Sequence, residues 1–257
     1  MANTNGLAIH RLVGGTALVT GAARGSGRAI AEAFVAMGAD VLAIDLLDME
    51  PIPGAVSLKL DITDEAAVER AVTDGLNGRP FQIVVNNAGI YKQSPFEEHS
   101  TELLNKIMSV NVTAPFVIMR AAANALIDRK LPGAFINLSS IGGTHAHRNC
   151  AGYCASKAAV LGLTRATALD LAPHDITVNS ICPGTVETDM IAQVAQDLTV
   201  ELDTDIDGAW KYLYGKIPLG RFQKPEDVAS MAVFLASMGA RNVTGAQLTL
   251  DGGETAV

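Results

Sequence analysis

Cysteine is scarce in this sequence. The 257 residues include only Cys150, Cys154 and Cys182, and no two of them form a CxxC pair. An odd, sparse set does not predict a disulfide framework, and without CxxC spacing we expect no metal site. The cysteines are typical of a protein from a reducing, cytoplasmic compartment.

Positive charge is also in short supply. The chain has 19 Lys and Arg residues against 27 Asp and Glu residues, which gives a formal net charge of −8. An acidic surface repels nucleic-acid phosphates and anionic lipid heads. Because no run of Lys and Arg offers a local basic patch, we expect no nucleic-acid partner.

Long apolar runs and a leader pattern are missing as well. No apolar run reaches the ~18–20 residues that a membrane helix needs, and the first residues, MANTNG, lack the charged-then-apolar layout of a signal peptide. We therefore expect no membrane partner. Hydrophobic residues nevertheless make up 49% of the chain, which is enough to bury a large core and excludes intrinsic disorder.

Short apolar runs alternate with helical stretches along the whole chain. The runs that predict strands are 16–20, 40–45, 56–61, 81–86, 134–138, 176–181 and 247–250. The stretches that predict helices are 25–37, 64–76, 101–127, 151–171 and 225–237. Apolar strands without polar alternation indicate a sheet covered on both faces, and their alternation with helices indicates parallel crossovers. We expect one α/β domain over residues 1–257, with a mostly parallel, seven-stranded sheet.

A glycine-rich turn joins the first predicted strand to the first predicted helix. It reads TGAARGSG over residues 20–27. Glycines at this place let the backbone approach a pyrophosphate, and the helix amino terminus offers amide donors. Asp45 ends the second predicted strand, where a carboxylate accepts hydrogen bonds from both ribose hydroxyls and repels a 2′-phosphate. This carboxylate favours NAD over NADP, although Arg24 could still pair with a phosphate.

Polar residues follow two further predicted strands. Asp61 ends the third strand, and Asn87-Ala88-Gly89 follows the fourth. Ligands bind at the carboxyl ends of strands in open α/β sheets. Asp, Asn and Gly are also the usual turn residues, so turn chemistry alone is the alternative explanation.

A tyrosine and a lysine share one face of a predicted helix. Tyr153 and Lys157 are four residues apart, and Ser140 lies 13 residues before Tyr153 at the end of a predicted strand. A Tyr-x-x-x-Lys pair alone is common by chance. Adjacent strand residues face opposite sides of a sheet, so only one of Ser139 and Ser140 can face a site beside the strand end.

The combination of motifs resembles the short-chain dehydrogenase/reductase (SDR) family over nearly the whole chain. The matching motifs are Thr20-Gly21-x-x-x-Gly25-x-Gly27, Asn86-Asn87-Ala88-Gly89, Asn111, Ser140, Tyr153-x-x-x-Lys157, and Pro183-Gly184 followed by Thr188. One departure is Ser26, where the family usually has an aliphatic residue. The resemblance implies a Rossmann-type, doubly wound fold and a homotetramer built around helices 101–127 and 151–171.

The resemblance also implies the catalytic roles. Tyr153 would exchange a proton with the alcohol or ketone, and Lys157 and the nicotinamide would lower the pKa of its phenol from about 10. Ser140, chosen over Ser139 by the family spacing, would hydrogen-bond the reacting oxygen. Asn111 would hold a water that connects Lys157 to solvent. The implied cofactor contacts are Gly21, Arg24, Gly25, Ser26, Gly27, Asp45, Asp61, Ile62, Asn87, Ala88, Gly89, Tyr153, Lys157, Pro183, Gly184, Val186 and Thr188.

The substrate end is less well defined by the sequence. Residues 185–218 are too long for a plain connection and predict a loop or a small helical lid. Its aromatic residues could cap a small organic substrate or pack on a neighbouring subunit. The substrate candidates are His145, His147, Asn149, Met190 and Trp210.

Three functions fit these residues. The first is an NAD-dependent dehydrogenase that acts on a small polyol, sugar or cyclic secondary alcohol. The second is a 3-oxoacyl-thioester reductase that uses NADPH; Asp45 and the net charge argue against it, while Arg129-Lys130 could receive an acidic carrier protein. The third is a non-catalytic dinucleotide-binding regulator, which has no need of the Ser140, Tyr153 and Lys157 set.

Overall fold

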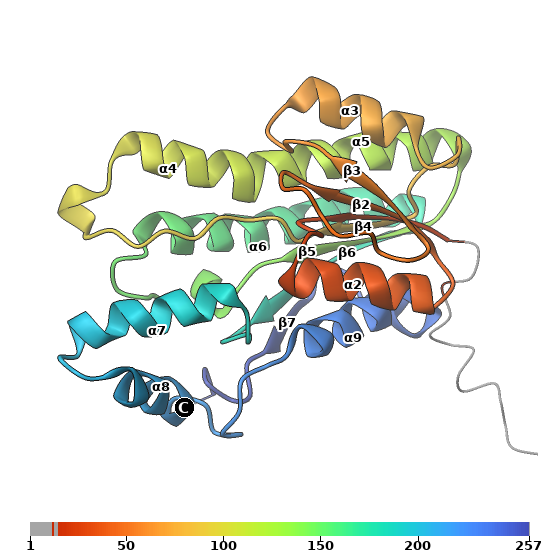
Figure 1. The fold of residues 1–257 in the computed structure, drawn as a ribbon. Coiled ribbons are helices and arrows are strands. Elements are labelled where there is room, and N and C mark those ends of the chain that lie inside the picture. Colours follow the sequence, from red (N-terminus) through yellow and green to blue (C-terminus); the bar gives the residue numbers. More distant parts are fainter. Residues whose placement is uncertain (1–11, 13–14, 257) are drawn as a thin grey trace, which may run out of the picture.

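Seven strands lie side by side in the order β3-β2-β1-β4-β5-β6-β7, and each neighbouring pair is parallel (Figure 1). This computed structural model describes residue 12 and residues 15–256. The strands are β1 (Thr16–Thr20), β2 (Asp40–Asp45), β3 (Ala55–Lys59), β4 (Ile83–Asn86), β5 (Gly133–Leu138), β6 (Ile176–Pro183) and β7 (Gln247–Leu250). The predicted Rossmann-type, doubly wound α/β domain is confirmed, and the described sheet is parallel throughout.

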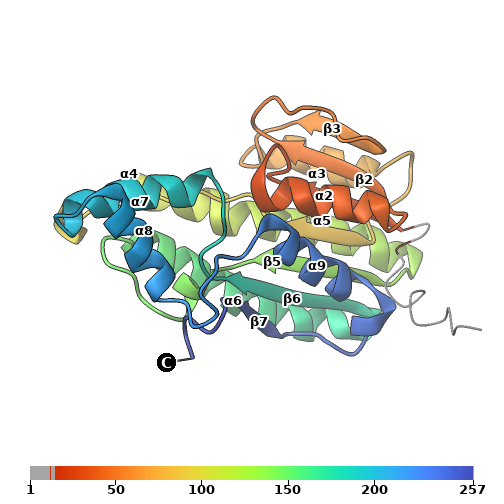
Figure 2. The same cartoon turned by 60° about the horizontal axis from the view of Figure 1, so that its bottom comes forward.

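Helices cover both faces of the sheet (Figure 2). The helices are α2 (Gly25–Ala36), α3 (Glu65–Asp74), α4 (Thr101–Met108), α5 (Ala114–Arg129), α6 (Ala151–Leu171), α7 (Asp189–Glu201), α8 (Ile206–Gly215) and α9 (Pro225–Ala236). One core joins the sheet to α2 and α9, and a second core joins it mainly to α3 and α5. Adjacent residues of β1 divide between them, because Val19 belongs to the first core and Leu18 to the second.

The predicted helical stretch 101–127 is confirmed, but it is not a regular α-helix throughout. Between α4 and α5 the chain forms a π-helical turn, Ser109–Thr113, which the sequence pattern did not indicate. Single π turns inside helices occur frequently at functional sites. The buried Asn111 lies in this turn, and its contacts belong to the site described below.

The same segment also corrects the expectation about membrane-length helices. The helical run Thr101–Arg129 has an 18-residue window with a mean hydropathy of 1.4, which is long and apolar enough to cross a membrane by length and composition. Within the domain, 56% of that window is buried. Core helices of soluble proteins have the same composition, so the helix is weak evidence for a membrane partner.

Smaller differences from the sequence predictions lie at element ends. The third strand ends at Lys59 rather than at Asp61, and the fourth begins at Ile83 rather than at Phe81. Asp64 caps α3, because its side chain accepts a hydrogen bond from the Ala67 amide at 3.0 Å. The segment 185–218 contains two helices, α7 and α8, so the helical alternative holds.

A chain of buried amides connects the centre of the sheet to α6. The Asn86 side chain donates to Asn137 Oδ1 at 2.8 Å, and Asn137 Nδ2 donates to Thr164 Oγ1 at 2.9 Å. Asn137 is 1% exposed. These bonds fix α6 against β4 and β5, the elements that carry the site.

We expect Asn137→Leu to lower the free energy of unfolding by roughly 2–4 kcal/mol, because it leaves buried polar groups of Asn86 and Thr164 unpaired. Urea denaturation measures the change. Thr73→Ala, at an exposed position on α3, is the control and should stay within about 0.5 kcal/mol of the unmodified protein. An equally small effect of Asn137→Leu would show that the amide chain does not stabilise the fold.

Candidate active site

A cleft of about 1360 Å³ opens at the carboxyl ends of the central strands. Each of five strands delivers at least one residue to its lining, such as Gly21 after β1, Asp45 from β2, Asn87 after β4, Ser140 after β5 and Gly184 after β6. Parallel strands place all these ends at one edge of the sheet. Segments far apart in the sequence therefore meet in one cavity.

The turn after β1 can be built only with glycine at two positions. Gly21 has a φ of 69°, and a Cβ atom there would lie 2.8 Å from Asn87 Nδ2. A Cβ on Gly27 would lie 2.0 Å from the Gly21 carbonyl oxygen. Gly27 is absent from the cleft lining, and it allows α2 to pack closely on the turn.

The amino terminus of α2 faces the cleft. Arg24, Gly25 and Ser26 line the cavity, and the first turn of α2 contains no acidic side chain. Amide donors and the positive end of the helix dipole are thus presented to the cavity. The turn and the helix terminus fit the pyrophosphate of a dinucleotide.

Asp45 lies at the end of β2 beside this turn. Its Oδ2 accepts from the Ala23 amide and its Oδ1 from the Leu47 amide, both at 2.9 Å. Each carboxylate oxygen has a second lone pair for another donor. The side chain therefore fixes the glycine turn and still presents acceptors to the cleft.

The predicted contacts after β3 and β4 also line the cleft. Asp61 forms an Asx turn, because its Oδ1 accepts from the Thr63 amide at 2.9 Å and from the Thr63 hydroxyl at 2.7 Å, and these bonds lower the pKa of Asp61. Asn87 Nδ2 donates to the carbonyls of Thr20 and Gly21 at 3.0 and 3.1 Å. Both side chains thus have structural bonds in addition to their place in the cavity. Ile62, Ala88 and Gly89 complete this wall.

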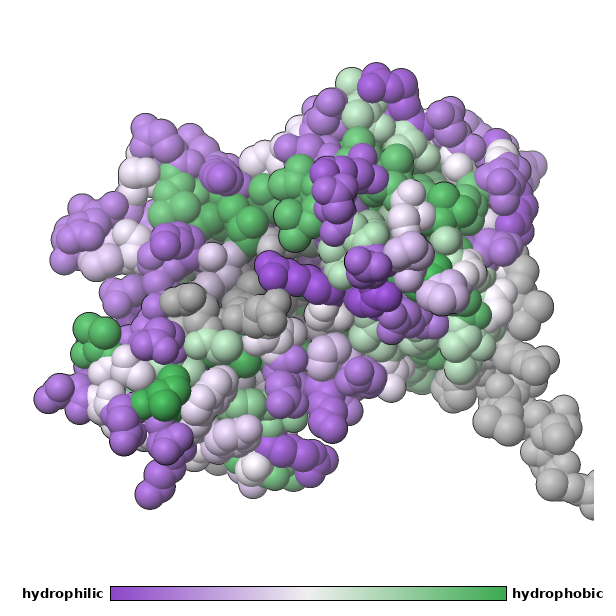
Figure 3. All heavy atoms as spheres, viewed as in Figure 1, coloured by the Kyte–Doolittle hydropathy of each residue, from purple (hydrophilic) through white to green (hydrophobic). Residues whose placement is uncertain are grey.

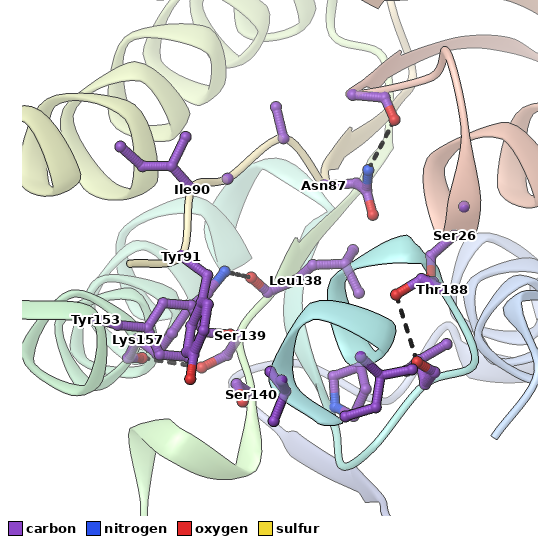
Figure 4. A pocket seen from close by; sticks show the side chains of 18 of the residues that line it. Ser26, Asn87, Ile90, Tyr91, Leu138, Ser139, Ser140, Tyr153, Lys157 and Thr188 are labelled. Carbon is purple, nitrogen blue, oxygen red and sulfur yellow. Dashed lines mark hydrogen bonds between the residues drawn. The ribbon is translucent and has the colours of Figure 1, made fainter. Parts of the chain in front are cut away.

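Tyr153, Lys157 and Ser140 converge on one side of the cleft (Figure 4). Tyr153 and Lys157 come from α6, and the Lys157 ammonium lies 5.7 Å from the centre of the Tyr153 ring. Gly142 lies beside both side chains. A Cβ atom on Gly142 would lie 3.3 Å from Tyr153 Cε1 and 3.4 Å from Ser140 Oγ, so the serine and the tyrosine are close neighbours.

The two adjacent serines have different partners. Ser139 is 5% exposed, and its hydroxyl donates to the Lys157 carbonyl at 2.9 Å. The Ser140 hydroxyl accepts from the Gly142 amide at 3.0 Å and remains partly exposed. Both serines line the cleft, so the expectation that only one of them can face it is wrong. The Ser139 hydroxyl is used to join β5 to α6, while the Ser140 hydroxyl is available to a molecule in the cleft.

Burial changes the proton affinity of both α6 residues. It raises the pKa of Tyr153 to about 12, against the opposing effect of a hydrogen bond with Ser140. It lowers the pKa of Lys157 to about 8, while the ammonium donates to the Leu138 carbonyl at 2.8 Å. In the sequence-based interpretation Lys157 lowers the pKa of Tyr153; in the structure the cost of burying the phenolate is the largest effect.

Asn111 uses its side chain to hold a neighbouring loop. Its Oδ1 accepts from the Ile90 amide at 2.8 Å, and its Nδ2 donates to the Ile90 carbonyl at 3.0 Å and to Ser156 Oγ at 3.0 Å. Asn111 itself does not line the cleft, although Ser109 and Val110 do. The role in holding a water therefore stays a prediction, and the direct contacts of the side chain are structural.

The segment after β6 closes the cofactor side. Pro183, Gly184, Val186 and Thr188 all line the cleft. The Thr188 hydroxyl donates to the Val186 carbonyl at 3.4 Å (Figure 4). Thr188 also approaches the glycine turn, because a Cβ on Gly25 would lie 3.4 Å from its methyl group.

The substrate candidates are only partly brought together. His147 lines the cleft, whereas His145 and Asn149 do not. Asn149 instead has a φ of 56° and accepts from the Ser94 amide through its carbonyl at 2.8 Å. Trp210 packs inside the lid against Phe222, with ring centroids 5.8 Å apart. The side chain of Met190 lies outside the described part of the structure.

The structure adds residues that the motifs did not indicate. Tyr91 lines the cleft, and its ring packs edge-on against Tyr153. Lys216 and Tyr212 from the lid and Glu254 from the carboxyl-terminal segment line the same cavity. For Tyr91 a signal was present, since it lies two residues after the predicted strand-end motif Asn87-Ala88-Gly89. Among the described residues, no group of three or more His, Cys, Asp or Glu side chains is placed to hold a metal.

Known proteins resemble the chain over nearly its full length. A family model described as enoyl-(acyl carrier protein) reductase matches residues 21–255. Sorbitol dehydrogenase from Cereibacter sphaeroides is 35% identical, with 95% of this chain and 98% of the relative covered. Galactitol 2-dehydrogenase from Agrobacterium fabrum is also 35% identical, with the same two shares covered.

The fold is matched equally well by solved structures. A Beutenbergia cavernae protein, provisionally described as an NAD(P)-dependent gluconate 5-dehydrogenase with NADP bound at low occupancy, superposes with a TM-score of 0.89 at 34% identity. The match covers 97% of this chain and all of that one. These findings and the dinucleotide-binding fold identify an oxidoreductase that interconverts a secondary alcohol and a ketone. The chain belongs to the short-chain dehydrogenase/reductase family.

Proposed function

We propose that the protein is an NAD(H)-dependent dehydrogenase of a small polyol, sugar or cyclic secondary alcohol, with Tyr153 as the acid/base. The observation that carries this proposal is the convergence of Ser140, Tyr153 and Lys157 in a cleft that continues to the glycine turn and Asp45. A bound dinucleotide supplies the hydride donor or acceptor in that cleft. The names of the relatives support the hydroxylated substrate class.

The side chains divide the work of proton transfer. Ser140 donates a hydrogen bond to the reacting oxygen and holds it beside the phenol. Tyr153 takes the proton of an alcohol, or gives a proton to a ketone, at its phenolic oxygen. Lys157 provides a positive charge near that oxygen, and its hydrogen bond to the Leu138 carbonyl keeps the ammonium in place.

We expect Tyr153→Phe to lower kcat by at least about 1,000-fold, because phenylalanine keeps the ring and removes the only proposed proton carrier. NADH binding, measured by fluorescence titration, should stay within about twofold of the unmodified protein. Turnover near the unmodified rate in Tyr153→Phe would refute the acid/base assignment.

The cofactor proposal is NAD rather than NADP. A carboxylate at Asp45 repels a 2′-phosphate and accepts hydrogen bonds from ribose hydroxyls. Its two backbone hydrogen bonds hold it at the mouth of the turn, so it cannot easily move away. Arg24 lines the same end of the cleft and is the residue that a 2′-phosphate would approach.

We expect Asp45→Asn to reduce the ratio of kcat/KM with NAD⁺ to kcat/KM with NADP⁺ by roughly 10- to 100-fold, which corresponds to about 1.4–2.7 kcal/mol. Asparagine keeps the size and one acceptor oxygen and removes the repelling charge. Initial-rate kinetics with both cofactors measure the ratio. A preference for NADP⁺ in the unmodified protein would contradict the cofactor proposal directly.

The lid contributes a cation to the substrate end of the cleft. Lys216, at the carboxyl end of α8, has its ammonium 4.3 Å from the centre of the Tyr212 ring, and both residues line the cavity. Burial, followed by the charge of Lys216, lowers the pKa of His147, and burial raises the pKa of Glu254 against the opposing charge of Lys216. Lys216 therefore acts electrostatically on both of these cleft residues. We assign Lys216 to the hydroxyl groups of the substrate remote from the reacting carbon.

We expect Lys216→Ala to reduce kcat/KM for polyols about 10-fold, the loss of one hydrogen bond to a charged donor, and to leave simple secondary alcohols within about twofold. Lys211→Ala is the matched control, because Lys211 is exposed on the same helix and does not line the cleft. Equal losses for polyols and simple alcohols would contradict the assignment.

The acyl-thioester alternative has less support from the geometry. Arg129 ends α5 and Lys130 follows it, shortly before β5 begins at Gly133. The two basic residues are therefore at the amino-terminal edge of the sheet, away from the cleft at the carboxyl-terminal edge. A carrier protein docked there could not deliver its acyl chain to Tyr153.

We also propose a cytoplasmic homotetramer assembled around α4–α5 and α6. Phe116 on α5 and Leu169 on α6 are exposed apolar residues on these helices, which supports an interface there. Figure 3 shows an apolar patch over α4 among hydrophilic side chains. The three cysteines are free thiols, which supports a reducing compartment.

A further inference from the structure

A second tyrosine lies against the proposed acid/base. The rings of Tyr91 and Tyr153 have their centres 5.0 Å apart and an interplanar angle of 84°, which is an edge-to-face contact (Figure 4). Such contacts are worth more than the area they bury and have a preferred geometry. The Tyr91 ring therefore restricts the position of the Tyr153 ring.

The π turn holds the backbone next to Tyr91. Asn111 bonds both the amide and the carbonyl of Ile90, the residue immediately before Tyr91. The same asparagine also donates to Ser156, which lies next to Lys157 on α6. One buried amide thus fixes the Tyr91 loop relative to the helix that carries Tyr153.

Tyr91 is held at its other end by a thiol. Its phenolic oxygen lies 3.4 Å from Cys150 Sγ, within hydrogen-bond distance for sulfur. Cys150 is fully buried and immediately precedes α6. Burial, followed by the contact with Cys150, raises the pKa of Tyr91 above its ordinary value.

We propose that Tyr91 is a positioning residue for Tyr153, which keeps the catalytic phenol buried and correctly oriented through its ring and through the contact of its hydroxyl with Cys150. The inference rests on the proposed function, because it assumes that Tyr153 exchanges the proton. The ionisable and polar groups around Tyr153 are Lys157, Ser140, Cys150, Cys154, His147 and Tyr91 itself.

Removing the ring tests the first half of the proposal. Burial is the largest cause of the raised pKa of Tyr153, so Tyr91→Leu should expose the phenol and lower that pKa. Alcohol oxidation needs the deprotonated phenol, so its kcat/KM rises with pH through the pKa that Tyr153 has in the complex with NAD⁺, where the positively charged nicotinamide also acts on it. We expect the rising limb to move to lower pH by about one unit and kcat to fall roughly 10-fold or more through misorientation. NAD⁺ affinity should not change.

Removing the hydroxyl contact tests the second half. Tyr91→Phe and Cys150→Ala each break the contact and leave an aromatic ring at position 91. Each should therefore lower kcat by about 3-fold, and kcat/KM should still rise over the same pH range as in the unmodified protein. The double variant should lose no more than either single variant, because both remove the same interaction. Cys150→Ser, which keeps a hydrogen-bonding group, should restore most of the lost rate.

Several outcomes would overturn the proposal. One is a Tyr91→Leu protein whose kcat/KM rises over the same pH range as in the unmodified protein and in which only KM for the alcohol changes. That result would mean that Tyr91 only forms part of the pocket wall. Another is a double variant whose loss of kcat equals the product of the losses in Tyr91→Phe and Cys150→Ala, since the two groups would then act independently. This second test applies even if Tyr91→Leu fails to fold. Turnover by Tyr153→Phe would instead refute the proposed function and is measured alongside.

Discussion

The hydrogen bond from the Lys157 ammonium to the Leu138 carbonyl, 2.8 Å long, determines the geometry of the catalytic side of the cleft. It joins α6 to the end of β5, and the Ser139 hydroxyl joins the same two elements by donating to the Lys157 carbonyl. Ser140 lies two residues after the end of β5, and Tyr153 lies one turn before Lys157 on α6. These two bonds therefore fix the position of the serine relative to the tyrosine. Lys157 is 6% exposed, and burial of its charge in this place is tolerated because the ammonium has a carbonyl partner.

The π turn is the second constraint, and it acts from the other side of the site. A regular helix over residues 101–127 would turn Asn111 to a different angle, away from Ile90. The local widening places the carboxamide so that it pairs with both backbone groups of Ile90 and with Ser156. The loop that follows β4 would otherwise be anchored mainly at its start, where Asn87 holds the carbonyls of the glycine turn. The irregular turn in the helix therefore fixes the whole loop from Asn87 to Tyr91.

Sequence reasoning recovers the parts of this protein that depend on local pattern. The apolar runs predicted all seven strands. The ends of the strands predicted the place of the site, because most of the glycine turn, Asp45, Ser140 and Lys157 line the cleft there. It failed where the outcome depends on contacts between distant segments. The π turn depends on a partner 21 residues away in sequence, and the contact between Tyr91 and Tyr153 depends on how a loop folds over α6. His145 and His147 are only two residues apart, yet of the two only His147 lines the cavity, while the His145 ring nitrogen Nδ1 lies 3.0 Å from the Thr144 hydroxyl.

The two halves of the cleft are built on different physical principles. The cofactor half consists of backbone turns and strand ends, where a Cβ on Gly21 or Gly27 would collide with neighbouring atoms. The other half is lined partly by side chains of α7 and α8, whose Ala195 and Leu213 pack with Ile217 and Phe222 into a small core separate from the two cores of the sheet. Substitutions such as one at Lys216 can therefore change the chemistry of the cleft without disturbing the sheet that supports Tyr153. Under the proposed function, substrate preference would depend on these helices rather than on the sheet, which is why family motifs specify the reaction and leave the alcohol open.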